Sequence, residues 1–454
     1  MLDIMIVLGC VSQCLDTTAF RHLTRIIEAM LSMSGRVTML GISRWTGPGG
    51  SYRTVQRFFN RVLDWGQLQW LLIRTHLLND DGVMLVSGDH VVVTKAGKQT
   101  HGLDRFFSSL YGKPVPGLCF LCLSLMSAKS RKSYPVLTEQ VEKPLQRASS
   151  AQGKETETTK KSKSKSKSKS LSHGRGGRPK GSQNRNRRDI ELSASLRFIQ
   201  HQLLHLQQLV GTHLKLVYFL FDGELGHNDG VQMVRQTGMH LISKLKCNSA
   251  LYFPYTGAYS GRGPHRKYGD KLDYANIHEI YLQKSYIEKQ IETKIYQMSL
   301  WHKTFVDMIN VVVMVKTNLK TQARAHVVLF SSDLTLGFAK LIDYYQLRFQ
   351  IEFNFRDAKQ YWGLEDFMNV NERPVYNSAN LAMFMVNVSQ ALIRQMRGQW
   401  PEFSVNDLKA WFRGRKYVVE TLKRLPEIPD AILIDEVIAQ VSELGRVNHV
   451  PVPA

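Results

Sequence analysis

Four polar residue types occur at fixed spacing in one stretch of the chain, Tyr345-x2-Arg348-x3-Glu352-x6-Lys359. Apolar residues in the same stretch recur at steps of three and four, which predicts a helix. Steps of four and then seven residues place Arg348, Glu352 and Lys359 on one face of that helix. A carboxylate between two cations on one face is either a surface ion-pair ladder, worth roughly 0.2–0.5 kcal/mol per pair, or a metal ligand between two phosphate-binding groups.

The chain also carries a large excess of positive charge. Its 454 residues include 60 lysine and arginine residues against 38 aspartate and glutamate residues, a formal net charge of +22. Charge of this size favours a polyanionic partner through counterion release. A membrane surface is the alternative, but no long basic amphipathic helix is present, so nucleic acid is favoured. The apolar content of 43% is enough for packed cores.

Cysteine usage and hydropathy predict a soluble, cytoplasmic protein. Cys119 and Cys122 lie inside a strand-like apolar run, with no second ligand pair at zinc-finger spacing. We therefore expect buried reduced thiols there rather than a zinc site. The N-terminus has no basic region typical of a signal peptide, and no apolar run is long enough to cross a membrane.

Two apolar, strand-like runs end in an aspartate. Residues 83–88 lead into Asp89, and residues 216–221 lead into Asp222. Together with the four-residue signature, these runs resemble the bacterial insertion-sequence transposases of the cut-and-paste type, which have an RNase H-like DDE core and a Tyr-Arg-Glu-Lys signature. The resemblance spans roughly residues 80–370 and implies a prokaryotic protein located in the nucleoid.

The resemblance implies that Asp89, Asp222 and Glu352 are the catalytic carboxylates and hold two Mg²⁺ ions, for which Mn²⁺ can substitute. Asp222 would bridge both ions, Asp89 would bind the first and Glu352 the second. Phosphodiester transfer needs a deprotonated nucleophile and a stabilised leaving oxygen, and two ions about 3.5–4 Å apart supply both. Mg²⁺ prefers carboxylate oxygens and keeps several waters, so few protein ligands suffice.

The first carboxylate has alternatives. The family usually follows its first aspartate with a small polar or acidic residue, whereas His90 follows Asp89 here. Asp80 and Asp81 are therefore rivals for that position.

The resemblance also implies residues that contact DNA. Tyr345, Arg348 and Lys359 would hold phosphates around the scissile bond, because arginine offers a bidentate fork and lysine a point charge. Trp301 either stacks on a flipped base, as an aromatic residue does in some relatives, or is a core tryptophan.

The N-terminal region predicts a second DNA contact. Ser51 is a suitable N-cap for a helix that carries Arg53, Arg57 and Arg61 at four-residue steps after a Gly-Pro-Gly-Gly turn. A short helix, a turn and an arginine-lined helix resemble a helix-turn-helix. The alternative is an ordinary helical bundle with a solvated arginine face.

Residues 154–188 form a basic insert of low complexity, which we expect to be disordered because it cannot bury a core. The segment around Arg178 and Lys180 resembles part of an AT-hook, which binds the narrow minor groove of A·T-rich DNA. The alternative is a plain basic tether.

These patterns predict an α/β RNase H-like catalytic core with a β-rich insertion, an N-terminal helical DNA-binding domain and a helical C-terminal region. The predicted segments are 1–75 (helix-turn-helix-like domain), 76–153 (first half of the core), 154–188 (basic insert), 189–250 (second part of the core), 251–335 (β-rich insertion domain), 336–395 (core completion with the catalytic helix) and 396–454 (C-terminal helices).

The resulting functional hypothesis is a DNA transposase that cleaves element ends and joins 3′-hydroxyls to target DNA. Its partners would be double-stranded DNA, as terminal repeats and as target, and a second copy of the chain in a synaptic homodimer. Two alternatives remain: a catalytically silent DNA-binding protein derived from a transposase, and an RNase H-like nuclease without strand transfer.

Overall fold

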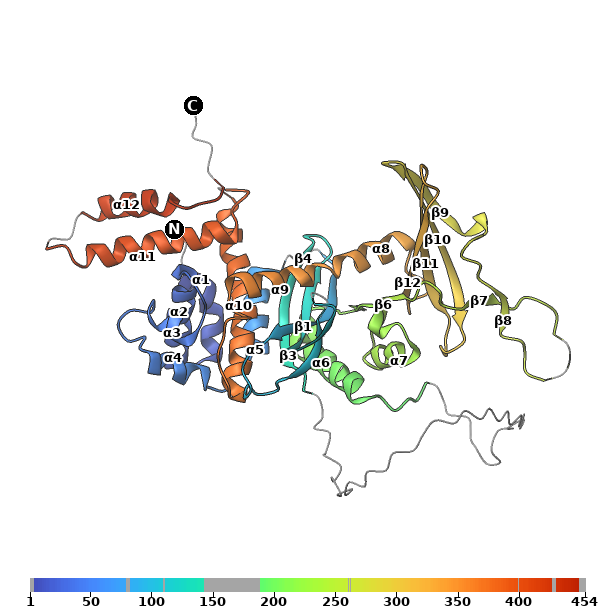
Figure 1. Cartoon of the computed structure of the whole chain (residues 1–454), viewed down its shortest axis with the longest axis horizontal. Coiled ribbons are helices and arrows are strands. Elements are labelled where there is room, and N and C mark those ends of the chain that lie inside the picture. Colours follow the sequence, from blue (N-terminus) through green and yellow to red (C-terminus); the bar gives the residue numbers. More distant parts are fainter. Residues whose placement is uncertain are drawn as a thin grey trace, which may run out of the picture.

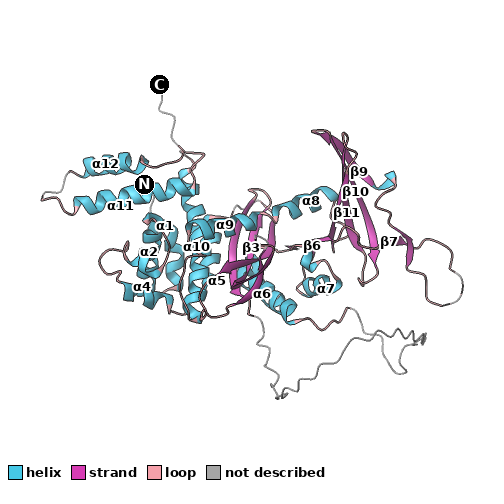
Figure 2. Cartoon of the chain, viewed as in Figure 1, coloured by secondary structure: helices cyan, strands magenta, loops and turns pink. Residues whose placement is uncertain are grey.

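The computed structural model describes residues 4–78, 82–108, 111–142, 188–259, 261, 263–398, 400–426 and 430–448. Helices from both ends of the chain form one body, a mixed sheet lies beside it, and further strands extend that sheet on the far side (Figure 1). Figure 2 shows helices concentrated at the end that holds the N-terminus and strands at the opposite end.

Five strands form the centre of the sheet: β1 (Met84–Thr94), β3 (Lys113–Ser127), β4 (Lys132–Gln140), β5 (Tyr218–Leu220) and β6 (His240–Leu245). Their order is β4-β3-β1-β5-β6; β1, β3 and β4 pair antiparallel, whereas β1, β5 and β6 pair parallel. This mixed antiparallel and parallel pairing fits the predicted α/β core. Strand β2 (Asp104–Ser108), which was not predicted, pairs with β3. Cys119 and Cys122 are buried free thiols in β3, as expected.

Six further strands occupy the predicted β-rich region: β7 (Leu251–Pro254), β8 (Tyr268–Lys271), β9 (Leu282–Glu288), β10 (Ile291–His302), β11 (Ile309–Asn318) and β12 (Arg324–Ser331). Strand β12 pairs antiparallel with β6, so this region continues the core sheet through hydrogen bonds. The region is therefore β-rich as predicted, and its strands belong to the same sheet as the core strands. That pairing joins segments distant in sequence, which a local pattern does not reveal.

Five helices accompany the sheet: α6 (Ala194–Val210), α7 (Asn228–Gln236), α8 (Phe338–Leu347), α9 (Gln350–Tyr361) and α10 (Glu372–Met396). Helices α9 and α10 pack against β4, and α9 also contacts β1. The buried Asn354 of α9 donates a hydrogen bond to the Ser133 hydroxyl of β4 (2.7 Å). This pairing of buried polar groups fixes the helix on the sheet, because an unpaired partner would be costly.

The helical body combines the two ends of the chain: α1 (Ile4–Leu8), η1 (Gly9–Cys14), α2 (Thr17–Ser32), α3 (Met39–Ser43), α4 (Tyr52–Phe59), α5 (Trp65–His76), α11 (Val405–Leu422) and α12 (Ala431–Glu443). Helix α2 packs on α11, and α5 packs on α10. The buried Trp65 indole donates to Asn377 (2.8 Å), and the buried Asn387 amide donates to Gln69 (2.6 Å). No helix in the described ranges is long and apolar enough for a membrane span.

Candidate active site

Asp89 and Asp222 lie at equivalent positions of two neighbouring parallel strands. β1 and β5 pair at Ser87 and Leu220, and each aspartate lies two residues beyond the paired residue of its own segment. Side chains two residues apart on an extended chain point to the same face. The register therefore places both half-buried carboxylates on one face at one end of the strand pair.

Backbone amides orient both carboxylates. Asp89 Oδ1 accepts a hydrogen bond from the His90 amide (2.8 Å). Asp222 Oδ1 accepts one from the Glu224 amide (2.9 Å) and so caps the short 3₁₀ helix η3 (Gly223–Leu225). Each aspartate thus has one oxygen held by the chain close to its own position.

Arg348 and Glu352 lie beside a junction between two helices, where a single helix was predicted. The signature was expected on one continuous helix, but α8 ends at residue 347 and α9 begins at residue 350. Amides on both sides of this junction, such as those of Arg348 and Glu352, donate hydrogen bonds to carbonyls three residues back, which is the tighter 3₁₀ pattern. Side-chain spacing misses this change because Arg348 and Phe349 keep right-handed helical dihedral angles.

The Arg348 guanidinium lies between two of the predicted carboxylates. Its Nη1 is 3.2 Å from Asp89 Oδ2, and its Nη2 is 3.6 Å from Glu352 Oε1. The Arg348 side chain is only 8% exposed, against 23% for Asp89 and 51% for Glu352. Arg348, Asp89 and Glu352 therefore form one charged cluster beside the central strand β1.

Burial and charge both affect protonation of this cluster. Burial raises the pKa of Asp89, Arg348 opposes that rise, and the nearby Asp222 carboxylate adds to it. Burial also raises the pKa of Glu352, again opposed by Arg348 and reinforced by Asp89. A cation beside Asp89 and Glu352 would favour the ionised forms of these two side chains.

The donor chemistry suits a hard divalent cation. Asp89, Asp222 and Glu352 offer the carboxylate oxygens that Mg²⁺ prefers. Among the described residues, no three Asp, Glu, His or Cys side chains are gathered closely enough to hold one metal ion. Arg348 supplies the positive charge between Asp89 and Glu352.

Residues 10–304 match the family model described as DDE superfamily endonuclease, which covers more than half of the chain. The chain belongs to the DDE superfamily endonucleases. A search of curated proteins found no match. The matched range of this DDE endonuclease contains Asp89 and Asp222 and ends before Glu352. DDE superfamily enzymes generally use divalent metals, and the mixed sheet with its flanking helices fits an RNase H-like core.

Tyr345 and Lys359, the other two residues of the predicted signature, have different surroundings. Tyr345 is buried, with its ring centre 5.9 Å from the Arg348 guanidinium carbon. Lys359 Nζ donates to the Val92 carbonyl of β1 (3.1 Å) and pairs with Glu365 (2.8 Å). Tyr345 therefore adjoins the charged cluster, whereas Lys359 binds further along β1.

The predicted arginine face lies in the helical body. Ser51 caps α4 by accepting a hydrogen bond from the Thr54 amide (3.4 Å), as predicted. Arg53 and Arg57 are exposed on α4, while Arg61 lies beyond the helix and pairs with an aspartate at the start of α2. Four other predicted positions lie outside the described residues: Asp80, Asp81, Arg178 and Lys180.

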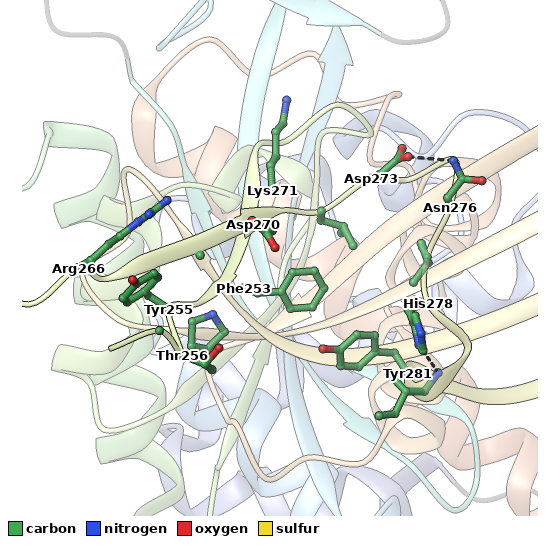
Figure 3. A pocket seen from close by; sticks show the side chains of 16 residues that line it. Phe253, Tyr255, Thr256, Arg266, Asp270, Lys271, Asp273, Asn276, His278 and Tyr281 are labelled. Atoms are coloured by element: carbon green, nitrogen blue, oxygen red, sulfur yellow. Dashed lines mark hydrogen bonds between the residues drawn. The ribbon is translucent and has the colours of Figure 1, made fainter. Parts of the chain in front are cut away.

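Trp301 belongs to an aromatic and cationic patch and is only half-buried. It pairs with Tyr252 of β7, and Lys267 Nζ lies 3.5 Å from its ring centre. Near this patch, β7 and β8 line a pocket of about 630 Å³, in which Arg266 stacks over the Tyr255 ring (Figure 3). None of the three carboxylates lines this pocket, and three strands separate β10 from β5.

One acidic residue near the site was not predicted. Glu224 Oε2 lies 3.8 Å from His90 Nδ1, so the residues that follow the two aspartates meet across the strands. His90 also packs edge-on against Phe221, which gives this unusual neighbour of Asp89 a structural role. The Asp222-Gly-Glu sequence was the available signal.

Proposed function

We propose that the chain is a DNA transposase of the bacterial insertion-sequence, cut-and-paste type, which cleaves element ends by metal-dependent hydrolysis and joins their 3′-hydroxyls to target DNA. The observation that carries this proposal is the meeting of Asp89 and Asp222 on adjacent parallel strands, with Glu352 linked to Asp89 through Arg348. Membership of the DDE endonucleases supports it, and a net charge of +22 suits a DNA substrate.

Asp89, Asp222 and Glu352 would hold two Mg²⁺ ions, with Mn²⁺ as a substitute and Asp222 as the shared ligand. When bound, such ions lower the pKa of the attacking water or 3′-hydroxyl and stabilise the leaving oxygen. The protein's own contribution is orientation: the amides of His90 and Glu224 each hold one carboxylate oxygen of the neighbouring aspartate.

Arg348, Lys359 and Tyr345 would bind phosphates around the scissile bond. Lys359 is half-exposed and now pairs with Glu365, so a phosphate would take the place of that carboxylate. The Val92 carbonyl would keep the ammonium group beside β1 during this exchange.

Other surfaces would bind the rest of the DNA. The exposed Arg53 and Arg57 would contact terminal repeats, in a synaptic complex of two chains. A flipped base could stack on Trp301 by replacing Lys267 on the indole ring, and the displaced ammonium could then pair with a phosphate.

The direct test is a transposition reaction with purified protein. The DNA on both sides of the gene would be searched for inverted repeats and placed in a plasmid, and excision and 3′-end joining would be followed with Mg²⁺ present. The proposal expects cleavage at the repeats and joined products. Cleavage without end preference or joining would instead indicate a nuclease, and binding of ends without any cleavage a silent derivative.

Lys359→Ala is expected to slow cleavage about 10- to 100-fold, because a hydrogen bond to a charged group contributes about 1.5–3 kcal/mol. Mn²⁺ affinity should not change, since Glu365, its ion-pair partner, is not a proposed metal ligand. Single-turnover cleavage and calorimetry would be compared in the same preparation. Glu365→Gln removes the same ion pair but keeps the ammonium, so equal losses in both variants would assign Lys359 to folding.

A further inference from the structure

We propose that Arg348 couples metal binding to DNA binding: it neutralises Asp89 and Glu352 in the free protein and moves to a DNA phosphate when an element end binds. This inference rests on the proposed function and deepens it. It makes Arg348 a positioning residue with two alternative partners, and it links occupancy of the metal site to the presence of DNA.

The first support is the position of the guanidinium. It lies 3.2 Å from Asp89 and 3.6 Å from Glu352, beside two of the carboxylates proposed to hold metal ions. Two positive charges cannot lie close together there without repulsion. Metal binding at Asp89 and Glu352 therefore requires Arg348 to weaken or leave these contacts.

The second support is unused hydrogen-bonding capacity. The Arg348 side chain is almost fully buried, yet in the part of the chain that the structure describes its Nε has no hydrogen-bond acceptor. At 3.6 Å, Glu352 is also too distant for a good hydrogen bond. A phosphate presents oxygens that match the guanidinium fork bidentately, so DNA offers Arg348 a better partner than the free protein does.

The third support is the backbone at this residue. Arg348 lies in the junction between α8 and α9, which has 3₁₀-type hydrogen bonds, and not within a regular α-helix. The exposed ring of Phe349 lies 4.8 Å from the guanidinium carbon and offers it an apolar face. Positions at the ends of elements are where small dihedral changes are absorbed, so Arg348 can shift while both helices persist.

Coupling of this kind is reciprocal: DNA must raise metal affinity by the same factor by which metal raises DNA affinity. We expect a factor of about 10, within the usual range for coupled sites. In Arg348→Gln this factor should fall to about 1. Mn²⁺ should also bind more tightly to the DNA-free variant than to the DNA-free wild type, because a competing positive charge is gone.

The test is calorimetric titration of Mn²⁺ into the full chain, with and without a short duplex that already ends in a 3′-hydroxyl at the terminal repeat. Such a duplex needs no hydrolysis, so binding is measured without turnover. Arg356→Gln is the matched control, because Arg356 lies on α9, is 59% exposed and pairs with its neighbour Asp357 at 3.0 Å. It should retain the wild-type factor.

Three outcomes decide the inference. A coupling factor in Arg348→Gln equal to that of wild type would overturn it, and so would weaker Mn²⁺ binding by the DNA-free variant, which would make Arg348 a support for the carboxylates. If Arg348→Gln does not fold, the wild type alone still decides, because identical Mn²⁺ affinity with and without DNA refutes the coupling. A wrong assignment of the metal site would give a different result: the chain would bind no Mn²⁺, or Asp222→Asn would leave Mn²⁺ binding unchanged.

Discussion

Asp222→Asn is expected to reduce DNA strand cleavage by more than about 100-fold, while binding of element ends stays close to wild type. Loss of a group that only supports a metal ligand typically costs 10–100-fold in metal affinity or activity, so loss of a ligand should cost more. Asparagine keeps an oxygen that can accept the hydrogen bond from the Glu224 amide. The change therefore removes charge with little effect on the local fold. Cleavage of labelled ends with Mg²⁺ and gel-shift binding would be measured side by side.

Glu224→Gln is the matched control for this variant. Glu224 is acidic, 58% exposed and two residues from Asp222, but it is not one of the proposed metal ligands. Cleavage by Glu224→Gln should remain within a few-fold of wild type. Near-normal cleavage by Asp222→Asn would refute the site. The same test on Asp89→Asn separates Asp89 from its rivals, since normal cleavage there would turn attention to Asp80 or Asp81.

The strands that lead to Asp89 and Asp222, and the helix that carries Glu352, were predictable because each segment has a strong local signal. Asp89 and Asp222 end apolar runs, and those runs became β1 and β5. That the two strands are neighbours is a non-local fact, supplied by the parallel pairing of Ser87 with Leu220. Only the family resemblance indicated that the two aspartates lie close together, because no local sequence pattern shows which strands pair.

Side-chain partners in the site were less predictable. Periodicity placed Arg348, Glu352 and Lys359 on one face, and the ion pair between Arg348 and Glu352 agrees with that. The junction between α8 and α9 was missed because 3₁₀ and α segments share nearly the same dihedral angles. The hydrogen bond from Lys359 to the Val92 carbonyl was also missed, since it depends on how α9 packs against β1.

The cluster around Arg348 explains how a site rich in negative charge can exist in a protein that we propose binds a polyanion. Without a counterion, Asp89 and Asp222 would repel each other and also repel DNA phosphates. Arg348 reduces both effects, because it is buried against Asp89 and reaches Glu352. The opposing influences on the pKa of Asp89, raised by burial and by Asp222 but lowered by Arg348, describe the same balance.

Neutralising the basic insert is expected to weaken DNA binding by about 100-fold or more at 0.15 M salt. Residues 158–187 contain eleven lysine and arginine residues, and replacing them with serine and glutamine keeps the length of the chain. Each DNA phosphate that is no longer neutralised lowers the slope of log affinity against log salt by about 0.9, so three such phosphates account for roughly 100-fold at that salt.

The design leaves Arg188 in place. Arg188 pairs with Asp307 at 2.9 Å, and Asp307 also pairs with Arg235 of α7, so the end of the insert keeps its attachment to the folded domain. Any decrease in binding then reflects the eleven cations and not a loosened anchor.

Restoring only the segment around Arg178 and Lys180 distinguishes an AT-hook from a tether. A tether predicts a decrease in affinity that is independent of DNA sequence, because lysines then bind phosphates alone. An AT-hook predicts that the restored segment regains affinity for A·T-rich duplexes but not for G·C-rich ones. Equal recovery on both duplexes excludes the AT-hook. A salt slope unchanged by neutralisation would refute the proposal that the insert binds DNA.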